Sequence, residues 1–380
     1  MASEQANHFA TKRRQAFQTD TEPDPRITGG TMNTVTVTRR HRPVSWPAVA
    51  AGMVAAGMVA ASVLVVAATP ARAAFPGANG WIAFVSDRDS TTAALNDEIY
   101  VTDQYGAPAI RLTNQPGLDS QPAVSPNGKQ IAFVSSRDTV EFPNLEGDLE
   151  LYVMDAVDAD GDGNGDHLRR LTDNAAADAT PAWSPGGKKL AFRSLRDGNG
   201  EIYLMDAEGD GSAVNLTNHP ANDQLPVFSP DGTTLAFTTN RDVNFEIYLM
   251  GADGSAPTNL TNNPANDAWP EFSPDGTKLA FGSNREATVA TEIDIWVLHL
   301  DGSGPPVNLT DALVTNERWP AWSPDGTKIA FWSGTGAGLG TDAEIYAMNA
   351  DGTGTPTNLT HNQAGDVFPD WGPAAAKKSR

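Results

Sequence analysis

A short unit recurs along this chain, and its recurrence limits the possible fold more than any other feature. The clearest copy is Trp-Pro-Glu-Phe-Ser-Pro-Asp-Gly-Thr-Lys-Leu-Ala-Phe, residues 269–281. Apolar residues alternate with other residues in both flanks, as they do in half-buried strands. Between the flanks, Pro274 presets φ for a type I turn, and Asp275 and Gly276 tolerate the right- and left-handed conformations that follow. The unit therefore predicts two strands joined by a tight turn.

The Ser-Pro-x-Gly turn is repeated at intervals of 44 to 59 residues, and each copy runs into an apolar-Ala-Phe strand. Self-similarity at this spacing indicates a repeat architecture. The copies begin at Ser125, Ser184, Ser229, Ser273 and Ser323.

Each repeat contains four strand-like runs, which we call strands A to D. In one repeat they cover residues 225–228, 235–238, 246–250 and 258–261. Four short antiparallel strands in a repeat of this length are typical of a propeller blade. The chain is therefore expected to be all-β, a six-bladed β-propeller with four-stranded antiparallel blades.

The sixth copy of the unit is divided between the two ends of the repeat region. Residues 80–112 contain strands B, C and D of one blade, and residues 367–371 contain a strand A with nothing after it. If the C-terminal strand completes this first blade, the ring closes without an unpaired edge between its first and last blades.

The segment before the repeats has the features of an export signal. Residues 1–38 are polar and patternless, as in a disordered leader. Residues 39–73 combine a basic start, an apolar run and Ala71-Arg72-Ala73, which together predict a signal peptide. Met32 offers a start codon that would give this peptide a normal length. The alternative is an uncleaved membrane anchor, because about 20 apolar residues span a bilayer.

These observations divide the chain into a leader (1–38), a signal peptide or anchor (39–73), a propeller (74–373) and a tail (374–380). We expect the propeller to be secreted or periplasmic, or alternatively to be anchored in the membrane and to lie outside the cytoplasm. In the second case the membrane is contacted only through the uncleaved N-terminal segment.

The propeller region is strongly acidic. Residues 1–73 hold 8 Lys/Arg and 4 Asp/Glu, which leaves 18 and 43 for residues 74–380, a formal charge of −25. Such a surface repels phosphate backbones and anionic lipids, so nucleic acid is not an expected partner. The charge either serves solubility alone or recruits cations and basic ligands.

Two acidic positions and one basic position recur with the strands. The segment of strand A starts with an acidic residue in every repeat: Asp119, Asp178, Asp223, Asp267, Glu317 and Asp366. An arginine follows strand B in Arg88, Arg137, Arg196, Arg241 and Arg285, whereas the last repeat has no arginine there. A second acid begins strand C in Glu98, Glu150, Glu201, Glu246, Asp294 and Glu344. We expect the first acids to cap loops by accepting backbone N–H groups, and each arginine to pair with the strand C acid across its hairpin.

The loop between strands C and D of the second blade is unlike the short Asp-Gly turns elsewhere. It places acids at positions 1, 3, 5 and 9 and glycine at position 6, a spacing with which hard oxygen ligands can enclose Ca²⁺. The alternative is a solvated acidic loop without metal. The proposed calcium ligands are Asp158, Asp160, Asp162, Asn164 through its carbonyl, and Asp166.

Taken together, the Trp-Ser-Pro-Asp-Gly, Ile-Ala-Phe, Arg-Asp, Glu-Ile-Tyr and Leu-Thr motifs of residues 77–373 resemble those of the TolB-type propeller family. The resemblance implies an exported propeller that binds other proteins or peptides and is not itself an enzyme. TolB also has an α/β domain before its propeller, which this sequence does not show.

A binding function places the ligand on the face formed by the D–A and B–C loops. There the residues beside the strand A prolines vary between repeats, and aromatic residues in such positions are common anchors for peptides. The expected ligand is an envelope or extracellular protein or peptide, held by Trp269, Trp319, Phe368, Glu271 and Asp370. In the alternative interpretation, the two tryptophans pack between blades.

The competing function is a lyase or glycan hydrolase that acts in the central funnel. Its candidates are Glu271 and Asp370, which stand where other repeats have Ala or Val. Two carboxyl groups about 5–10 Å apart can serve as general acid and base. No Gly-x-Ser-x-Gly motif is present to suggest a serine nucleophile.

Overall fold

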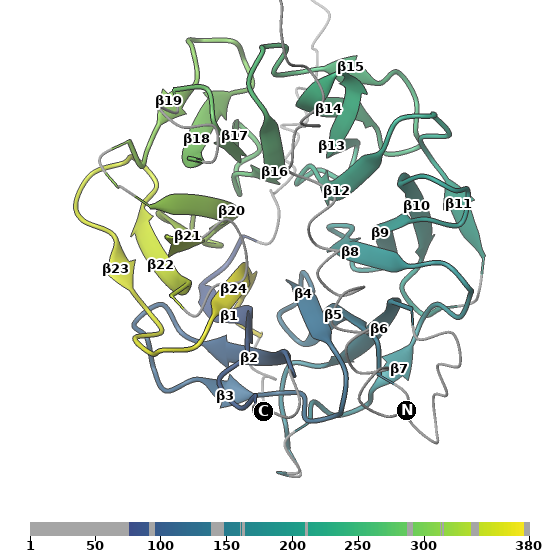
Figure 1. Ribbon diagram of the computed structural model, residues 1–380, viewed down its shortest axis with the longest axis vertical. Helices are drawn as coiled ribbons and strands as arrows, with labels where there is room; N and C mark the ends of the chain where they lie inside the picture. The colour runs from purple at the N-terminus through teal and green to yellow at the C-terminus, as the bar shows by residue number, and fades with distance from the viewer. Residues whose placement is uncertain are drawn as a thin grey trace, which may run out of the picture. The chain divides into compact units, whose positions relative to one another are not determined.

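The structure is a computed structural model that describes residues 76–90, 96–137, 148–159, 161, 164–209, 212–286, 292–311, 313, 315–335 and 342–375. Within these ranges the chain forms strands and turns, and six four-stranded antiparallel sheets surround a common axis (Figure 1). The predicted six-bladed propeller is therefore confirmed. The described residues contain no helix long and apolar enough to cross a membrane. The expected leader and signal segment, residues 1–73, lie outside the described residues.

The strands occupy four positions in each blade, and strand A is the innermost (Figure 1). The A strands are β4 (Asp119–Val124), β8 (Asp178–Trp183), β12 (Asp223–Phe228), β16 (Asp267–Phe272), β20 (Asn316–Trp322) and β24 (Asp366–Pro373). The B strands are β1 (Asn79–Ser86), β5 (Gln130–Ser135), β9 (Lys189–Ser194), β13 (Thr234–Asp242), β17 (Lys278–Ser283) and β21 (Lys328–Gly334). The C strands are β2 (Glu98–Thr102), β6 (Glu150–Asp155), β10 (Glu201–Asp206), β14 (Asn244–Gly251), β18 (Asp294–His299) and β22 (Glu344–Asn349). The D strands are β3 (Ile110–Arg111), β7 (Arg169–Arg170), β11 (Ala213–Asn215), β15 (Thr258–Asn259), β19 (Val307–Asn308) and β23 (Thr357–Asn358).

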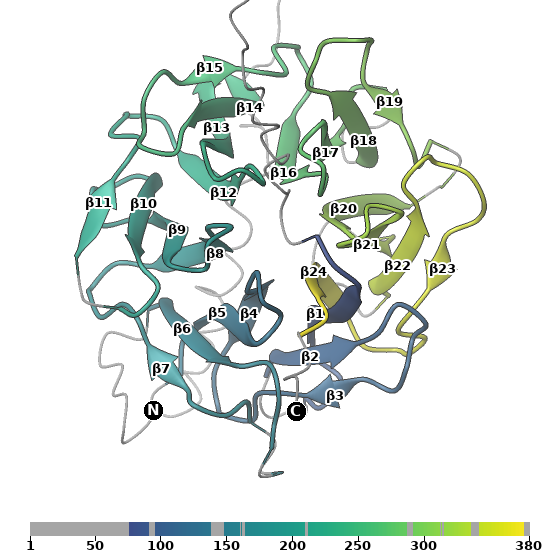
Figure 2. The same ribbon diagram turned by 180° about the vertical axis from the view of Figure 1, so that it is seen from behind.

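The ring is closed by its last strand. Strand β24 pairs antiparallel with β1 and completes the sheet β24-β1-β2-β3, which we call blade 1 (Figure 2). The register aligns Trp371 with Ile82 and Asp366 with Ser86. Blades 2 to 6 follow in chain order, from β4–β7 to β20–β23. The closure predicted from the divided sixth repeat is confirmed.

The core consists of layers between neighbouring blades. The apolar-Ala-Phe segment of every strand B is inaccessible to solvent, and its phenylalanine lies near the aromatic residue of strand C. Aromatic side chains of strand A, such as Trp183 and Phe272, fill the space toward the adjacent blade. Each blade therefore buries both of its faces against its neighbours. A single blade would expose these apolar side chains to water and would not be stable by itself.

The arginine after strand B does not pair with the acid that we expected. In blades 1 to 5 its guanidinium contacts the acid at the start of strand A, at 2.7–3.0 Å. Asp119 shows the arrangement, because its two oxygens accept hydrogen bonds from Ser135 and Arg137. The guanidinium also lies over the aromatic rings of strands B and C, which adds a cation–π attraction.

The strand C acids perform the capping that we had assigned to strand A. Glu150 accepts a hydrogen bond from the amide of Asn174 and another from the hydroxyl of Thr172. Equivalent threonine contacts occur at Glu201, Glu246, Asp294 and Glu344. The two expected roles are thus exchanged, because the arginine side chain reaches back across strand B to the innermost strand.

Blade 6 stabilises its strand A acid without an arginine. Glu317 replaces the aspartate and is fully buried, and it accepts hydrogen bonds from Thr315 and Ser333. Thr335 stands where the other blades have arginine. Burial raises the pKa of Glu317 to about 8, and the neighbouring Asp294 contributes to the increase. Glu317 is therefore largely a neutral acid at neutral pH, which removes the need for a positive partner.

Removal of residues 366–380 should destabilise the propeller, because it deletes β24 and uncovers β1. The loss includes the buried side chains of Val367, Phe368 and Trp371, each worth about 1.5–3 kcal/mol. We expect the free energy of unfolding to fall by on the order of 5 kcal/mol, measured by thermal and urea unfolding. A chain that ends at Ala375 keeps β24 and serves as the control. A melting temperature within a degree or two of the full chain would contradict the closure.

Candidate functional site

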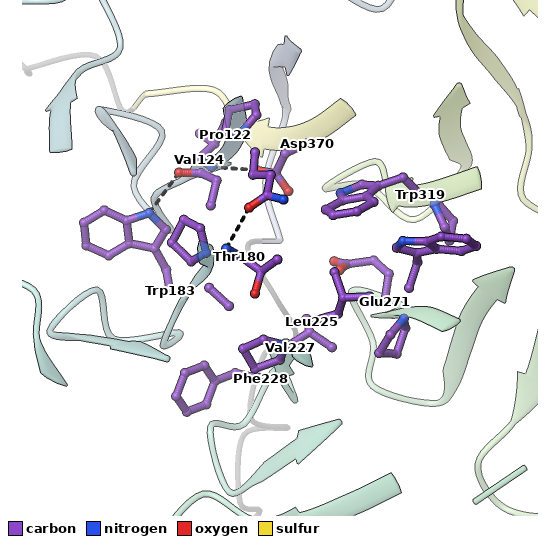
Figure 3. Close-up of a pocket in the computed structure, with 18 of the residues that line it drawn as sticks. Pro122, Val124, Thr180, Trp183, Leu225, Val227, Phe228, Glu271, Trp319 and Asp370 are labelled. Atoms are coloured by element: carbon purple, nitrogen blue, oxygen red, sulfur yellow. Dashed lines mark hydrogen bonds between the residues drawn. The ribbon is translucent and has the colours of Figure 1, made fainter. Parts of the chain in front are cut away.

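The centre of the ring contains a cavity of about 100 Å³. It is lined by residues of all six A strands, and Figure 3 shows their side chains around it. A volume of this size admits several water molecules or one side chain, whereas drug-sized ligands occupy roughly 300–1,000 Å³. The lining residues include Gln121, Thr180, Leu225, Glu271, Trp319 and Asp370.

The residue before each strand A proline has an unusual backbone conformation. All six have φ between 49° and 58°, although none is glycine and a proline follows each. This left-handed conformation interrupts the pairing of strands A and B, and the register shifts at that point in every blade. The six residues are Gln121, Thr180, Leu225, Trp269, Trp319 and Phe368.

Non-glycine residues adopt this conformation at a cost of about 1–3 kcal/mol, and the surrounding sheet has to maintain it. Five of the six residues line the cavity, so the strained position faces the axis. In five of the six blades the bulge therefore supplies one side chain that projects toward the channel and differs between blades.

Aromatic rings gather on one side of the axis. Trp319 lies between Trp269 and Phe368, with ring centroids 6.4 and 4.6 Å away. The two tryptophans are half-buried and line the cavity, whereas Phe368 is only 8% exposed and packs edge-on against Trp319. The guanidinium of Arg318 lies over Trp269 at 5.8 Å. The three predicted aromatic anchors thus form one cluster.

On the opposite side of the cavity, two hydrogen bonds connect neighbouring blades. The amide of Thr180 donates a hydrogen bond to the side chain of Gln121 at 2.8 Å (Figure 3). The indole of Trp183 donates to the carbonyl of Ala123 at 2.9 Å and turns its ring away from the axis. These contacts link blades 2 and 3 at the channel wall.

Two carboxyl groups project into the cavity between these sides (Figure 3). Asp370 accepts a hydrogen bond from the amide of Val124 at 2.6 Å, and burial raises its pKa to about 6. Burial also raises the pKa of Glu271 well above its usual value, and the charge of Asp370 raises it further. Glu271 borders the cavity and keeps some accessible surface.

The structure describes three of the five predicted calcium ligands. Asp160 and Asp162 lie outside the described residues. Asp158 and Asp166 accept hydrogen bonds from amides of their own loop at 2.7 and 3.3 Å, and the Asn164 side chain accepts one from blade 1 at 3.0 Å. Among the described residues, no group of three or more acidic or histidine side chains is placed to hold a metal. Calcium binding stays a prediction.

The sequence of this chain is similar to TolB proteins over part of its length. A profile of the TolB β-propeller domain matches residues 210–305. A TolB homolog of Chlorobium chlorochromatii is 29% identical over 149 residues, 30% of this chain and 31% of the relative. A second, from Chlorobaculum tepidum, is 31% identical over 128 residues, 34% of this chain and 25% of the relative. These matches span a third of the relatives' length or less.

Solved structures agree with the fold. TolB from Acinetobacter baumannii superposes with a TM-score of 0.62 at 23% identity, over 77% of this chain and 67% of that chain. A putative TolB from Agrobacterium tumefaciens gives a TM-score of 0.55 at 24% identity, over 77% and 91%. Likeness at these identities establishes the architecture alone, whereas the repeat motifs establish its type. The part of the propeller at residues 210–305 is therefore built from repeats of the TolB type.

Proposed function

We propose that this chain is an exported TolB-like propeller that binds an envelope or extracellular protein or peptide at its central channel and has no catalytic role. The observation that carries the proposal is the cavity on the axis, where five of the six blades contribute one variable side chain from a strained, otherwise uniform position. Aromatic anchors in a partly enclosed pocket are typical of binding sites. The similarity to TolB proteins supports a protein partner at the envelope.

The structural elements favour a scaffold that is rigid before the ligand arrives. The A strands are held by buried ion pairs and by both neighbouring blades, so little ordering is needed when a ligand binds. Preorganisation of this kind lowers the entropic cost of association. A small cavity that admits one side chain also suits a protein or peptide ligand better than a large metabolite.

A lyase or glycan hydrolase is the competing proposal. One observation favours it: Glu271 and Asp370 line the same cavity, and both of their pKa values are raised, that of Asp370 to about 6. Environments that hold one carboxyl group protonated and the other ionised are typical of acid–base pairs. Glycan cleavage that is lost in Glu271→Gln but retained in Trp319→Ala would favour the enzyme over the binding protein.

The binding proposal is tested with Trp319→Ala and, as control, Tyr105→Ala. Tyr105 is an 84% exposed aromatic residue in the loop between β2 and β3, away from the axis. After a partner has been captured from the envelope or secreted fraction and identified, its Kd is measured by calorimetry with each variant. Trp319→Ala should weaken binding at least tenfold, as truncated anchors do. Tyr105→Ala should leave the Kd unchanged.

Equal Kd values for wild type and a folded Trp319→Ala variant would contradict a ligand in the channel. Thermal melting of each variant shows whether it is folded. If Trp319→Ala melts too early, Trp319→Phe removes the indole with a smaller loss of packing.

We also propose that the loop 158–166 binds Ca²⁺. Binding to the folded state alone raises its stability, by about 1–2 kcal/mol at a few millimolar metal if Kd is typical of extracellular modules. The melting temperature should therefore rise from EDTA to CaCl₂, and rise less with MgCl₂. The increase should vanish in Asp160→Ala/Asp162→Ala. Coincident melting curves of the wild type with and without Ca²⁺ would indicate a solvated loop that binds no metal.

A further inference from the structure

The two carboxyl groups in the channel occupy one repeated position. They stand between the strand A proline and the aromatic residue that follows it, where the other four blades have small apolar side chains. Glu271 belongs to β16 and Asp370 to β24, and β20 of blade 6 lies between them in the ring (Figure 1). The counterparts in the other blades are Ala123, Ala182, Val227 and Ala321.

No positive group of the described residues compensates these carboxyl groups. Glu271 has no hydrogen-bond or ion-pair partner there, and Asp370 has the single amide hydrogen bond described above. The A strands contain one basic residue, Arg318, whose guanidinium lies over the rings of Trp269 and Trp332 at 5.8 and 5.3 Å. Arg318 is not among the groups that shift the pKa of either carboxyl group.

The acids at the blade junctions show how this protein treats a buried carboxylate elsewhere. Five of the six strand A acids have an arginine within 3.0 Å, and Glu317 has two hydroxyl donors. A buried charge without such partners is costly, so it is seldom kept for stability alone. The channel carboxyl groups are thus the exception within their own fold.

We propose that the channel receives one positively charged group, an ammonium or a guanidinium, from the protein or peptide that binds the propeller. This inference rests on the proposed function and specifies its ligand. The cation would lie between Glu271 and Asp370, with the indole of Trp319 at its side. A cavity of about 100 Å³ accommodates the end of one lysine or arginine side chain, or an N-terminal amine. The formal charge of −25 on residues 74–380 favours the approach of a cationic partner.

The inference predicts a characteristic pH dependence. The carboxyl groups attract a cation only when ionised, and burial places the pKa of Asp370 at about 6. Binding should therefore strengthen as pH rises from 5 to 7.5, by about tenfold, as Asp370 loses its proton. An ordinary exposed aspartate is ionised across this whole range and would give no such change.

The probe is n-butylammonium, which has the shape and charge of a lysine side chain, compared with 1-butanol, which has the shape without the charge. Binding to the full chain is measured by saturation-transfer NMR, with EDTA present so that divalent metals do not occupy the carboxyl groups. We expect a saturable signal for n-butylammonium at about pH 7.5, a much weaker signal at about pH 5, and none for 1-butanol.

The decisive variant is Glu271→Gln/Asp370→Asn, which keeps the shapes and removes both charges. The carboxamide introduced at position 370 retains an oxygen for the Val124 amide, and the loss of buried charge should not lower the melting temperature. The matched control is Asp301→Asn/Asp351→Asn, which removes two charges from exposed loops. The n-butylammonium signal should disappear in the first variant and persist in the second.

Equal signals for n-butylammonium and 1-butanol, or a signal that survives Glu271→Gln/Asp370→Asn, would overturn the inference. The same holds if an identified partner binds this variant with the wild-type Kd, and in that case the proposed binding function would stand. A different outcome is also informative: the n-butylammonium signal depends on charge, but the partner binds Trp319→Ala with the wild-type Kd. This result would contradict the proposed function and leave the cation site intact.

Discussion

At the head of each innermost strand, a buried acid connects one blade to the next. The amide of Asp119 donates to a carbonyl just before the strand C acid of the preceding blade, while its carboxylate holds the serine and arginine of its own strand B. The same backbone link recurs at Asp178, Asp223, Glu317 and Asp366. Because the acid is desolvated, it is stable only with these partners. The position of strand A along the axis, and with it the lining of the channel, depends on this contact.

Blade 6 shows which part of this arrangement is essential. It lacks the arginine, and the acid is Glu317, whose pKa burial raises to about 8. Hydroxyl groups donate hydrogen bonds to this protonated glutamic acid. Both kinds of junction therefore have no net charge: blades 1 to 5 pair a carboxylate with an arginine, and blade 6 has a protonated acid. The requirement is therefore a balance of charge, and the arginine is one way to meet it. Among the described residues, the channel acids have neither an arginine nor hydroxyl donors, which is why they stand out as sites for a ligand.

Much of the fold follows from the sequence because its signals are local and repeated. The Ser-Pro-Asp-Gly turn and the two flanking strands are encoded within 13 residues, and the divided repeat at the two ends predicts the β24–β1 pairing. The side-chain network was harder to predict. The arginine after strand B is near the acids of both strand A and strand C in the sequence, and only the packing decides with which of them it pairs. The left-handed residue before proline has no sequence signal, since a residue before proline normally favours an extended conformation. The sequence located Glu271 and Asp370 in the channel but could not show that they lack a cationic partner.

The central claim is that the ligand binds on the axis of the ring, at the strained residues of the A strands. Site-specific photo-crosslinking tests this most directly. Benzoylphenylalanine is placed at Leu225, in the cavity lining, and separately at Val214, which is exposed on the outer strand β11. We predict that the partner crosslinks to position 225 and not to position 214. Crosslinks at position 214 with none at position 225 would contradict the account.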